Sequence, residues 1–270
     1  MLSIYAGEFS DDDKDTQQTY ARFHRVHGQN VMLSDGRTRS TRLHSFAGGV
    51  CFSEEPLCEG RPFVVEIAEK ENGWCGHLRL GLTSRDPARR QTVPESSLPD
   101  MANSGEAWIV AITRGLSLLP DSGEMGPTLQ VGEYLIPREK LVGRSLPGRY
   151  SHVLDAAFHT GSIPATARGS RVGVLYTVLS RGPHGVASMH LLVNGRPVGP
   201  CATELPISRP LWALVDVFGC TKAVQVIELE YGVPSLKTLC RQLIQRRVSH
   251  RMDIDDLSIP EALKNYCKLE

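Results

Sequence analysis

The residues of this chain best suited to bond chemistry are a cysteine and a histidine separated by one glycine. Cys75 and His77 lie in a run that predicts a β-strand, and a thiolate beside a histidine can act as a nucleophile. Alternate residues of a strand face the same way, so Cys75, His77 and Arg79 would share one face. The opposite face would carry Trp74, Gly76, Leu78 and Leu80.

This strand can be interpreted in two ways. As a catalytic pair, Cys75 and His77 would need a hydrogen bond that positions i and i+2 of a flat strand rarely form, and no nearby acid orients His77. As a structural strand, the Trp74 side faces the core and the Cys75 side is a polar outer face. The second interpretation needs fewer assumptions. We therefore expect no catalytic residue, and we treat Cys75, His77 and Arg79 as candidate substrate-binding residues.

Metal chemistry has equally little support in the sequence. Cys51 and Cys58 lie near histidines, but their spacing matches no recognised ligand set. The seven cysteines are odd in number, widely scattered and without a Cys-x-x-Cys pair. We therefore expect no metal, no cofactor and reduced thiols, as in a cytoplasmic or nuclear protein, with the cytoplasm as the expected location.

Two apolar stripes in residues 235–270 carry the strongest signal. The first has helical spacing and follows Pro234 and Ser235, which mark a helix start. Its members are Leu236, Leu239, Cys240, Leu243 and Ile244. The second surrounds a proline, placed where a helix can begin. Its members are Leu257, Ile259, Pro260, Leu263, Tyr266 and Cys267.

A segment this small lacks the core to bury both stripes against itself. The stripes therefore predict a partner surface, with the first helix lying in a groove of the partner. The alternative is that the first helix caps the rest of the fold and the second stripe tucks under it. Four arginines are interpreted as the solvated face opposite the first stripe. They are Arg241, Arg246, Arg247 and Arg251.

The whole-chain totals exclude several classes of protein. Of the 270 residues, 41% are hydrophobic and 22% are charged, which is ordinary for a globular chain. Thirty basic and thirty acidic residues balance, so no global charge points to nucleic acid or an anionic membrane. The longest apolar stretch, residues 211–220, is short and contains Asp216, which argues against a membrane span. Residues 1–22 resemble no secretory signal and are expected to form a disordered acidic leader.

Residues 23–231 are mostly typical of strands, which together predict an antiparallel β-sandwich. The clearest runs are residues 50–52, 63–67, 77–82, 108–112, 172–178, 190–193 and 211–218. Asn194-Gly195 predicts a type I′ hairpin turn. Residues 84–106 and 115–132 are interpreted as long surface loops and residues 150–158 as a short helix.

Three blocks of this region resemble the neuralized homology repeat, a SPRY-like antiparallel β-sandwich. They are FHRVHGQNVMLSDGRTRSTRLHSFAGGVCFSEEPL (23–57), WCGHLRLGLTSRDP (74–87) and PLWALVDVFG (210–219). The blocks follow one another in the family's order. The resemblance implies one repeat over residues 23–231 that binds a substrate protein, with the loops at 84–106 and 115–132 as candidate contacts.

Residues 232–270 resemble a SOCS box, a small three-helix module. Its elongin-C-binding pattern is matched by Ser235, Leu236, Cys240 and Ile244, and its cullin-5 box by Leu257-Ser258-Ile259-Pro260, where Ser258 replaces a proline of the pattern. The resemblance implies that the first stripe contacts elongin C, which is bound to elongin B. It further implies a cullin-5 contact through Leu257, Ile259, Pro260, Leu263 and Tyr266. Leu263 is expected to turn partly inward onto the first helix.

Together the two resemblances imply a substrate-recognition adaptor of an elongin B/C–cullin-5–RING ubiquitin ligase, with a RING-box protein as a further partner. The target would be ubiquitinated and degraded by the proteasome. The subfamily with this arrangement is associated with striated muscle differentiation, which implies muscle cytoskeletal or junctional targets.

Some relatives end in a RING, which needs eight Cys or His ligands for two zinc ions. After residue 230 this chain has only Cys240, His250 and Cys267. We therefore expect a non-catalytic subunit that depends on its partners for ligase activity. The alternative is a protein-binding scaffold whose C-terminal helices pack internally without recruiting a ligase.

Overall fold

The computed structural model describes residues 21–89, 92–114, 116, 128–143, 163–229, 240, 241, 243, 244, 247, 248 and 251–268. Most of the expected leader and the helix expected at residues 150–158 lie outside these residues. Leu236 and Leu239 also lie outside them, as does the side chain of Tyr266.

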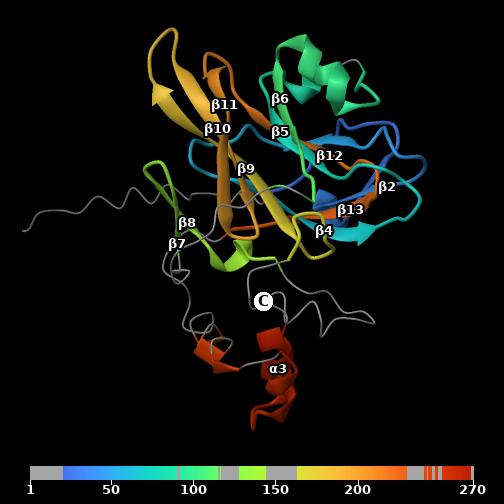
Figure 1. Cartoon of the computed structure of the whole chain (residues 1–270), viewed down its shortest axis with the longest axis vertical. Coiled ribbons are helices and arrows are strands. Elements are labelled where there is room, and N and C mark those ends of the chain that lie inside the picture. The colour runs from blue at the N-terminus through green and yellow to red at the C-terminus, as the bar shows by residue number, and fades with distance from the viewer. Residues whose placement is uncertain are drawn as a thin grey trace, which may run out of the picture.

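Two antiparallel sheets form the body of the protein (Figure 1). One has seven strands in the order β1-β2-β13-β4-β9-β10-β11, and the other has four in the order β3-β12-β5-β6. The strands of the larger sheet are β1 (Val31–Ser34), β2 (Arg39–Arg42), β4 (Phe63–Lys70), β9 (Arg171–Ser180), β10 (Val186–Val193), β11 (Arg196–Pro206) and β13 (Thr221–Ile227). Those of the smaller sheet are β3 (Val50–Phe52), β5 (Arg79–Thr83), β6 (Ala107–Ala111) and β12 (Trp212–Asp216). The predicted mainly β, antiparallel architecture is confirmed.

The main core lies between these sheets and follows the period-two alternation of their strands. Val65 and Ile67 of β4 belong to one buried cluster with Leu80 and Leu82 of β5 and Val215 of β12. Each of these side chains is fully buried, which contributes roughly 1.5–3 kcal/mol for a large aliphatic group. A slip of one residue would turn a whole strand face outward, so this burial fixes the strand registers.

A separate hairpin covers the other face of the larger sheet. Its strands are β7 (Thr128–Val131) and β8 (Tyr134–Pro137). Leu129 and Ile136 are buried in one cluster with Leu175 of β9. The prediction of a surface loop up to residue 132 is therefore wrong at its end, because Leu129 and Val131 supply a buried face.

The turn predicted at Asn194-Gly195 is confirmed. It joins β10 to β11, with Val193 opposite Arg196, and both turn residues have positive φ values of 49° and 78°. The strand predicted from residue 77 begins only at Arg79, since Gly76 has a φ of +84° that interrupts extended backbone. The short helical segments are η1 (Asp35–Arg37), η2 (Pro87–Arg89), the π-helical turn η3 (Ser97–Met101), η4 (Ala102–Ser104) and η5 (Glu139–Leu141).

The C-terminal segment contains the 3-10 helix η6 (Arg251–Asp256) and the α-helix α3 (Glu261–Lys268), drawn in red in Figure 1. Helical backbone is also found at Cys240, Arg241, Leu243, Ile244 and Arg247. The described residues therefore show one short bounded α-helix in place of the expected three-helix module. The aspartates of η6 have low helix propensity, and the ring of Pro260 prevents a helix from running through it.

Candidate functional site

Three chain crossings between the two sheets meet at one end of the sandwich. Residues 43–49 connect β2 to β3, residues 71–78 connect β4 to β5, and residues 217–220 connect β12 to β13. The strand register brings these ends together, with Lys70 opposite Thr221. We call the surface formed by these three crossings the loop end.

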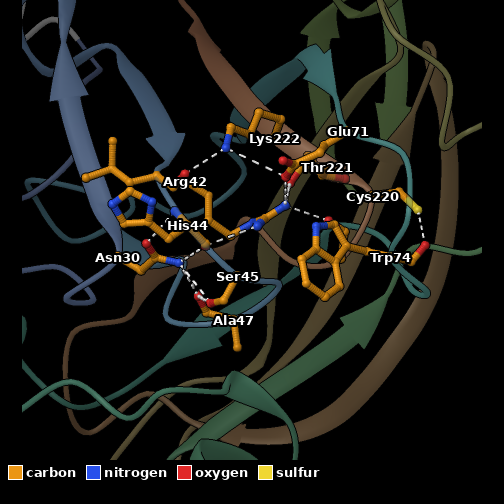
Figure 2. Close-up of polar contacts among 12 residues, drawn as sticks. Asn30, Arg42, His44, Ser45, Ala47, Glu71, Trp74, Cys220, Thr221 and Lys222 are labelled. Atoms are coloured by element: carbon orange, nitrogen blue, oxygen red, sulfur yellow. Dashed lines mark hydrogen bonds and ion pairs between the residues drawn. The ribbon is translucent and has the colours of Figure 1, made fainter.

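A buried arginine holds the crossings together (Figure 2). The guanidinium of Arg42 is fully buried and donates to the carbonyl oxygens of Gly219 (2.6 Å) and Thr221 (3.3 Å). The same nitrogen lies 3.1 Å from Oε2 of Glu71. A buried guanidinium is costly without partners, so these three acceptors fix where residues 71 and 219–221 lie relative to β2.

The loop at residues 43–49 is held from two sides (Figure 2). The side-chain amide of Asn30 donates to the carbonyl oxygens of Ala47 (2.7 Å) and His44, and its oxygen accepts from the His44 amide (2.8 Å). On the other side, Nζ of Lys222 donates to the carbonyl oxygen of Leu43 (2.9 Å). These contacts define the backbone that presents the side chains at the tip of the loop.

Each crossing contributes one aromatic ring to the loop end. The ring centroids of Phe46 and Trp74 are 5.4 Å apart, and those of Phe46 and Phe218 are 5.8 Å apart in an edge-to-face arrangement. Phe46 is 45% exposed and Trp74 is 37% exposed. The expectation that Trp74 faces the core is therefore wrong. The buried alternation of β5 stops at Leu78, because the backbone turns at Gly76.

Cys75 and His77 also lie at the loop end but do not form a catalytic pair. Cys75 is exposed, His77 is half-buried, and within the described residues no hydrogen bond joins them. Burial lowers the pKa of His77, and the charges of Lys70 and Arg114 lower it further. In the part of the chain that the structure describes, the thiol of Cys75 therefore has no hydrogen-bonded base to accept its proton. The protonated form of His77, which would stabilise a thiolate, is disfavoured.

Arg79 has a supporting position beneath the aromatic rings. Its Nη1 donates to Oγ of Ser96 (2.7 Å) and lies 3.3 Å from Oδ2 of Asp216. Its guanidinium carbon is 3.5 Å from the centroid of the Phe218 ring. Burial raises the pKa of Asp216. Hydrogen bonds from Ser97 and the charge of Arg79 oppose this shift. Arg79 therefore joins the loop end to the smaller sheet.

The first apolar stripe is open where the structure describes it. Cys240 is exposed, Leu243 is 59% exposed and Ile244 is half-buried. The other two predicted elongin contacts, Leu236 and Leu239, lie outside the described residues. The described part of this stripe is not covered by the β-sheets.

The second stripe is partly accessible where the structure describes it. Leu257 and Ile259 are half-buried, Pro260 is exposed and Leu263 is 44% exposed. Leu263 therefore turns inward less than expected. Helix α3 begins directly after Pro260, as predicted, and the Leu263 amide donates to the Pro260 carbonyl oxygen (2.8 Å). The side chain of Tyr266, also predicted to contact the cullin, lies outside the described part of the structure.

The tail has a small interior of its own. Arg241, Ile254 and Cys267 are only 4%, 2% and 3% exposed. Burial raises the pKa of the Cys267 thiol, and the charge of Arg241 opposes this shift. The assignment of Arg241 to the solvated face is therefore wrong, whereas Arg247 is exposed as expected. Cys267 faces the tail's interior.

Asn30, Arg42, Phe46 and Phe218 were not predicted from the sequence as parts of a site. Phe46 and Trp74 each stand beside glycines in turn-rich segments, which is a weak sign of an exposed aromatic side chain. No sequence spacing links these residues, because they meet only through the pairing of distant strands.

Neither a metal-binding cluster nor a membrane-spanning helix is present in the described residues. No group of three or more His, Cys, Asp or Glu side chains there could hold a metal ion. In that part of the chain, no helix is both long and apolar enough to cross a membrane.

Comparison with known proteins identifies a family for the sandwich region and another for the tail. Residues 23–228 match the Neuralized family model and residues 232–268 match the SOCS box model. The chain is 51% identical to human neuralized-like protein 2 over 264 residues, covering 92% of both chains. It is 26% identical to the rat E3 ubiquitin-protein ligase NEURL3 over 201 residues, covering 74% of this chain and 58% of that protein. The crystal structure of the Drosophila melanogaster neuralized NHR1 domain shares its fold, with a TM-score of 0.51 at 21% identity, over 77% of this chain and 98% of that one.

Proposed function

Because the chain belongs to the neuralized family and ends in a SOCS box, we propose that it is the substrate-recognition adaptor of an elongin B/C–cullin-5–RING ubiquitin ligase. The sandwich at residues 23–231 binds the target protein, and the tail at residues 232–270 binds elongin C and cullin-5. A RING-box protein on the cullin completes the complex. The cytoplasm and a role in striated muscle differentiation belong to this proposal on resemblance alone.

One observation carries the proposal most directly. Leu243 and Leu263 are 59% and 44% exposed, although the tail buries Ile254 and Cys267 in an interior of its own. The apolar stripes are thus left for a partner. Five anchors at roughly 1.5–3 kcal/mol each would contribute on the order of 7–15 kcal/mol, against an association cost of about 4–15 kcal/mol. This balance fits specific but not extreme binding.

The catalytic contribution of such an adaptor is proximity. Holding a target near a ubiquitin-charged enzyme raises the effective concentration of the reacting groups without bond chemistry by the adaptor. The tail has only Cys240, His250 and Cys267 as possible zinc ligands, too few for a RING. Recruitment of the ubiquitin-conjugating enzyme is therefore assigned to the partner RING protein.

A scaffold without ligase recruitment is the second candidate. The burial of Arg241 and Cys267 favours it in part, because some of the tail does pack internally. A scaffold of this kind would also have to cover Leu243, which is 59% exposed. Co-purification with elongins B and C distinguishes the two candidates.

Variants of the tail test the proposal in a capture assay with purified elongin B/C. We expect Leu236→Pro combined with Cys240→Phe to abolish capture, because one apolar anchor is removed and a small anchor is replaced by a large ring. The control is Arg247→Ala, since Arg247 is exposed and lies outside the stripe. Circular dichroism should show the sandwich intact in all variants. Undiminished capture by the double variant would contradict the assignment.

The second half of the tail is tested with cullin-5 in the same assay. We expect Ile259→Ala combined with Pro260→Ala to lose cullin-5 while retaining elongin C. Simultaneous loss of both partners would show that the tail is not divided into the two binding sites proposed.

A further inference from the structure

We infer that the loop end binds an extended acidic segment of the substrate protein. An aromatic or large aliphatic side chain of that segment packs on Phe46 and Trp74, and its carboxylates lie beside Lys70, His77 and Arg114. The inference rests on the proposed function, because it names the kind of segment that the substrate receptor takes.

The apolar half of this surface consists of Phe46 and Trp74. They are the two aromatic side chains among the exposed large hydrophobic residues of the described chain, and their ring centroids are 5.4 Å apart. Aromatic side chains exposed together and surrounded by polar groups are typical of protein-binding sites, where they serve as the anchors that contribute most of the binding energy.

The surface is ordered before any partner arrives. A Cβ atom at Gly76 would lie 2.7 Å from Cε1 of Phe218, and one at Gly219 would lie 2.4 Å from the carbonyl oxygen of Cys75. Both glycines have positive φ, so the close approach of these crossings depends on them. A surface fixed in this way loses little conformational entropy on binding.

The charged half comes from three neighbouring segments. Lys70 ends β4, His77 lies just before β5, and Arg114 follows β6. The backbone amide of Ile112 donates to the carbonyl oxygen of Leu78 (2.9 Å), which sets the segment after β6 beside the one before β5. Lys70 and Arg114 are exposed. His77 lies in the same crossing as Trp74, and Lys70 directly precedes that crossing.

Among the described residues, the carboxylates that flank Lys70 in sequence do not neutralise these basic groups. Glu69 and Glu71, which flank Lys70 in sequence, are paired with Arg39 and Arg42. In the described part of the chain no carboxylate forms an ion pair with Lys70 or with the other two basic side chains. Like charges this close repel one another, and an incoming carboxylate relieves that repulsion. The charge therefore favours an acidic partner.

A peptide segment fits this surface better than a membrane does. Two permanently charged groups, Lys70 and Arg114, at about 1 kcal/mol each would hold an anionic bilayer weakly, and the whole chain carries no net charge. A short peptide, in contrast, can place one apolar side chain and two or three carboxylates on a surface of this size.

The test measures fluorescence anisotropy of short labelled peptides with the full chain. The probe carries one tryptophan followed by several glutamates. One matched peptide has glutamine in place of each glutamate, and another has serine in place of tryptophan. We expect the probe to bind and each matched peptide to bind at least about tenfold more weakly. Equal binding of the probe and the glutamine peptide, or no binding of the probe, overturns the inference.

Variants of the chain locate the binding. We expect Trp74→Ser, Phe46→Ser and the double variant Lys70→Glu with Arg114→Glu each to weaken probe binding at least about tenfold. The matched controls, Leu179→Ser and Arg89→Glu, change side chains that are 59% and 86% exposed on other parts of the sandwich. Unchanged affinity in both aromatic variants, with thermal unfolding as in the wild type, overturns the inference.

The same experiment distinguishes two other occupants of the loop end, an anionic membrane and the chain's own N-terminal residues. Binding of phosphatidylserine vesicles with no binding of the probe would assign the surface to membranes. No probe binding by the wild type, with binding gained by a variant with asparagine in place of Asp11, Asp12 and Asp13, would assign it to the chain's own N-terminal residues. Either result overturns the inference. Elongin C capture is measured in parallel, so probe binding without capture contradicts the proposed function alone, and capture without probe binding contradicts this inference alone.

Discussion

Arg42 is the residue on which the loop end depends most. Its fully buried guanidinium supports the backbone at Gly219 and Thr221, and no other cation in the described residues bonds to these two carbonyl oxygens. The aromatic side chains can be exposed to solvent because this arginine holds the loops beneath them. At the scale of single residues, the loop end is therefore maintained by a fully buried side chain.

We expect Arg42→Met to lower the free energy of unfolding by about 3 kcal/mol or more, because buried acceptors lose their donor and Glu71 loses a partner. The matched variant Arg39→Met breaks a partly exposed pair with Glu69 and should cost no more than about 1 kcal/mol. Urea denaturation of both variants measures the difference. Equal losses would show that Arg42 has no special role.

His77 provides a reporter of the charge at the loop end. Its pKa is lowered by burial, and Lys70 and Arg114 add to the shift. Because the folded-state pKa lies below that of the unfolded chain, the unfolded state binds the proton first. The contribution of His77 to stability is therefore present above about pH 6.5 and is lost as the pH falls through the folded-state pKa.

We expect Lys70→Ala to raise the pKa of His77 toward its ordinary value, because one repelling charge is removed. An NMR titration of the His77 ring protons measures this directly. Arg89→Ala, at an exposed arginine on another part of the sandwich, should leave the pKa of His77 unchanged. A lower pKa in Lys70→Ala would contradict the electrostatic description of this surface.

At the scale of elements, the strands were the most predictable part of the chain. In runs such as residues 63–67 and 172–178, apolar residues alternate along the strand and fill one core. The period of the sequence pattern therefore matches the observed burial. The hairpin of β7 and β8 was missed because Leu129 and Val131 stand in a segment rich in turn-forming residues. The predicted alternation of core and outer residues does not extend before Leu78, because the positive φ of Gly76 redirects the chain. The sequence pattern did not reveal this change of direction.

The tail shows a division that spacing alone did not predict. Cys240 and Cys267 both fall on apolar stripes, but Cys240 is exposed and Cys267 is buried. The spacing of apolar residues predicts that a side chain packs against another apolar surface. It does not show whether that surface belongs to the same chain or to a partner. The burial of Arg241 could not be predicted either, because it depends on where α3 and η6 return against the first helical residues.

We expect Cys267→Lys to unfold the tail, because a second cation would be buried beside the buried guanidinium of Arg241. The matched variant Cys240→Ser changes an exposed cysteine of the same segment and should leave the tail folded. Limited trypsin digestion followed by mass spectrometry measures the rate of cleavage after residue 230, at the sites that both variants share. Equal cleavage rates in the two variants would contradict an interior at Cys267.

At the scale of the whole molecule, the chain combines two surfaces built on different principles. The loop end is fixed by a buried cation and tight backbone crossings. The tail carries open apolar stripes on a segment with a small interior. The resemblance of both regions to known families was visible in the sequence. The aromatic and basic surface was not, because residues 46, 74 and 218 meet only in the folded sandwich.

Isothermal titration calorimetry of the full chain with purified elongin B/C tests the adaptor function most directly. We expect a one-to-one complex with a negative heat-capacity change, because apolar side chains leave water when the stripe is covered. We also expect Leu243→Asp to remove most of the binding heat. Absence of a complex, or full binding by Leu243→Asp, would contradict the claim that the exposed stripe joins this protein to a ubiquitin ligase.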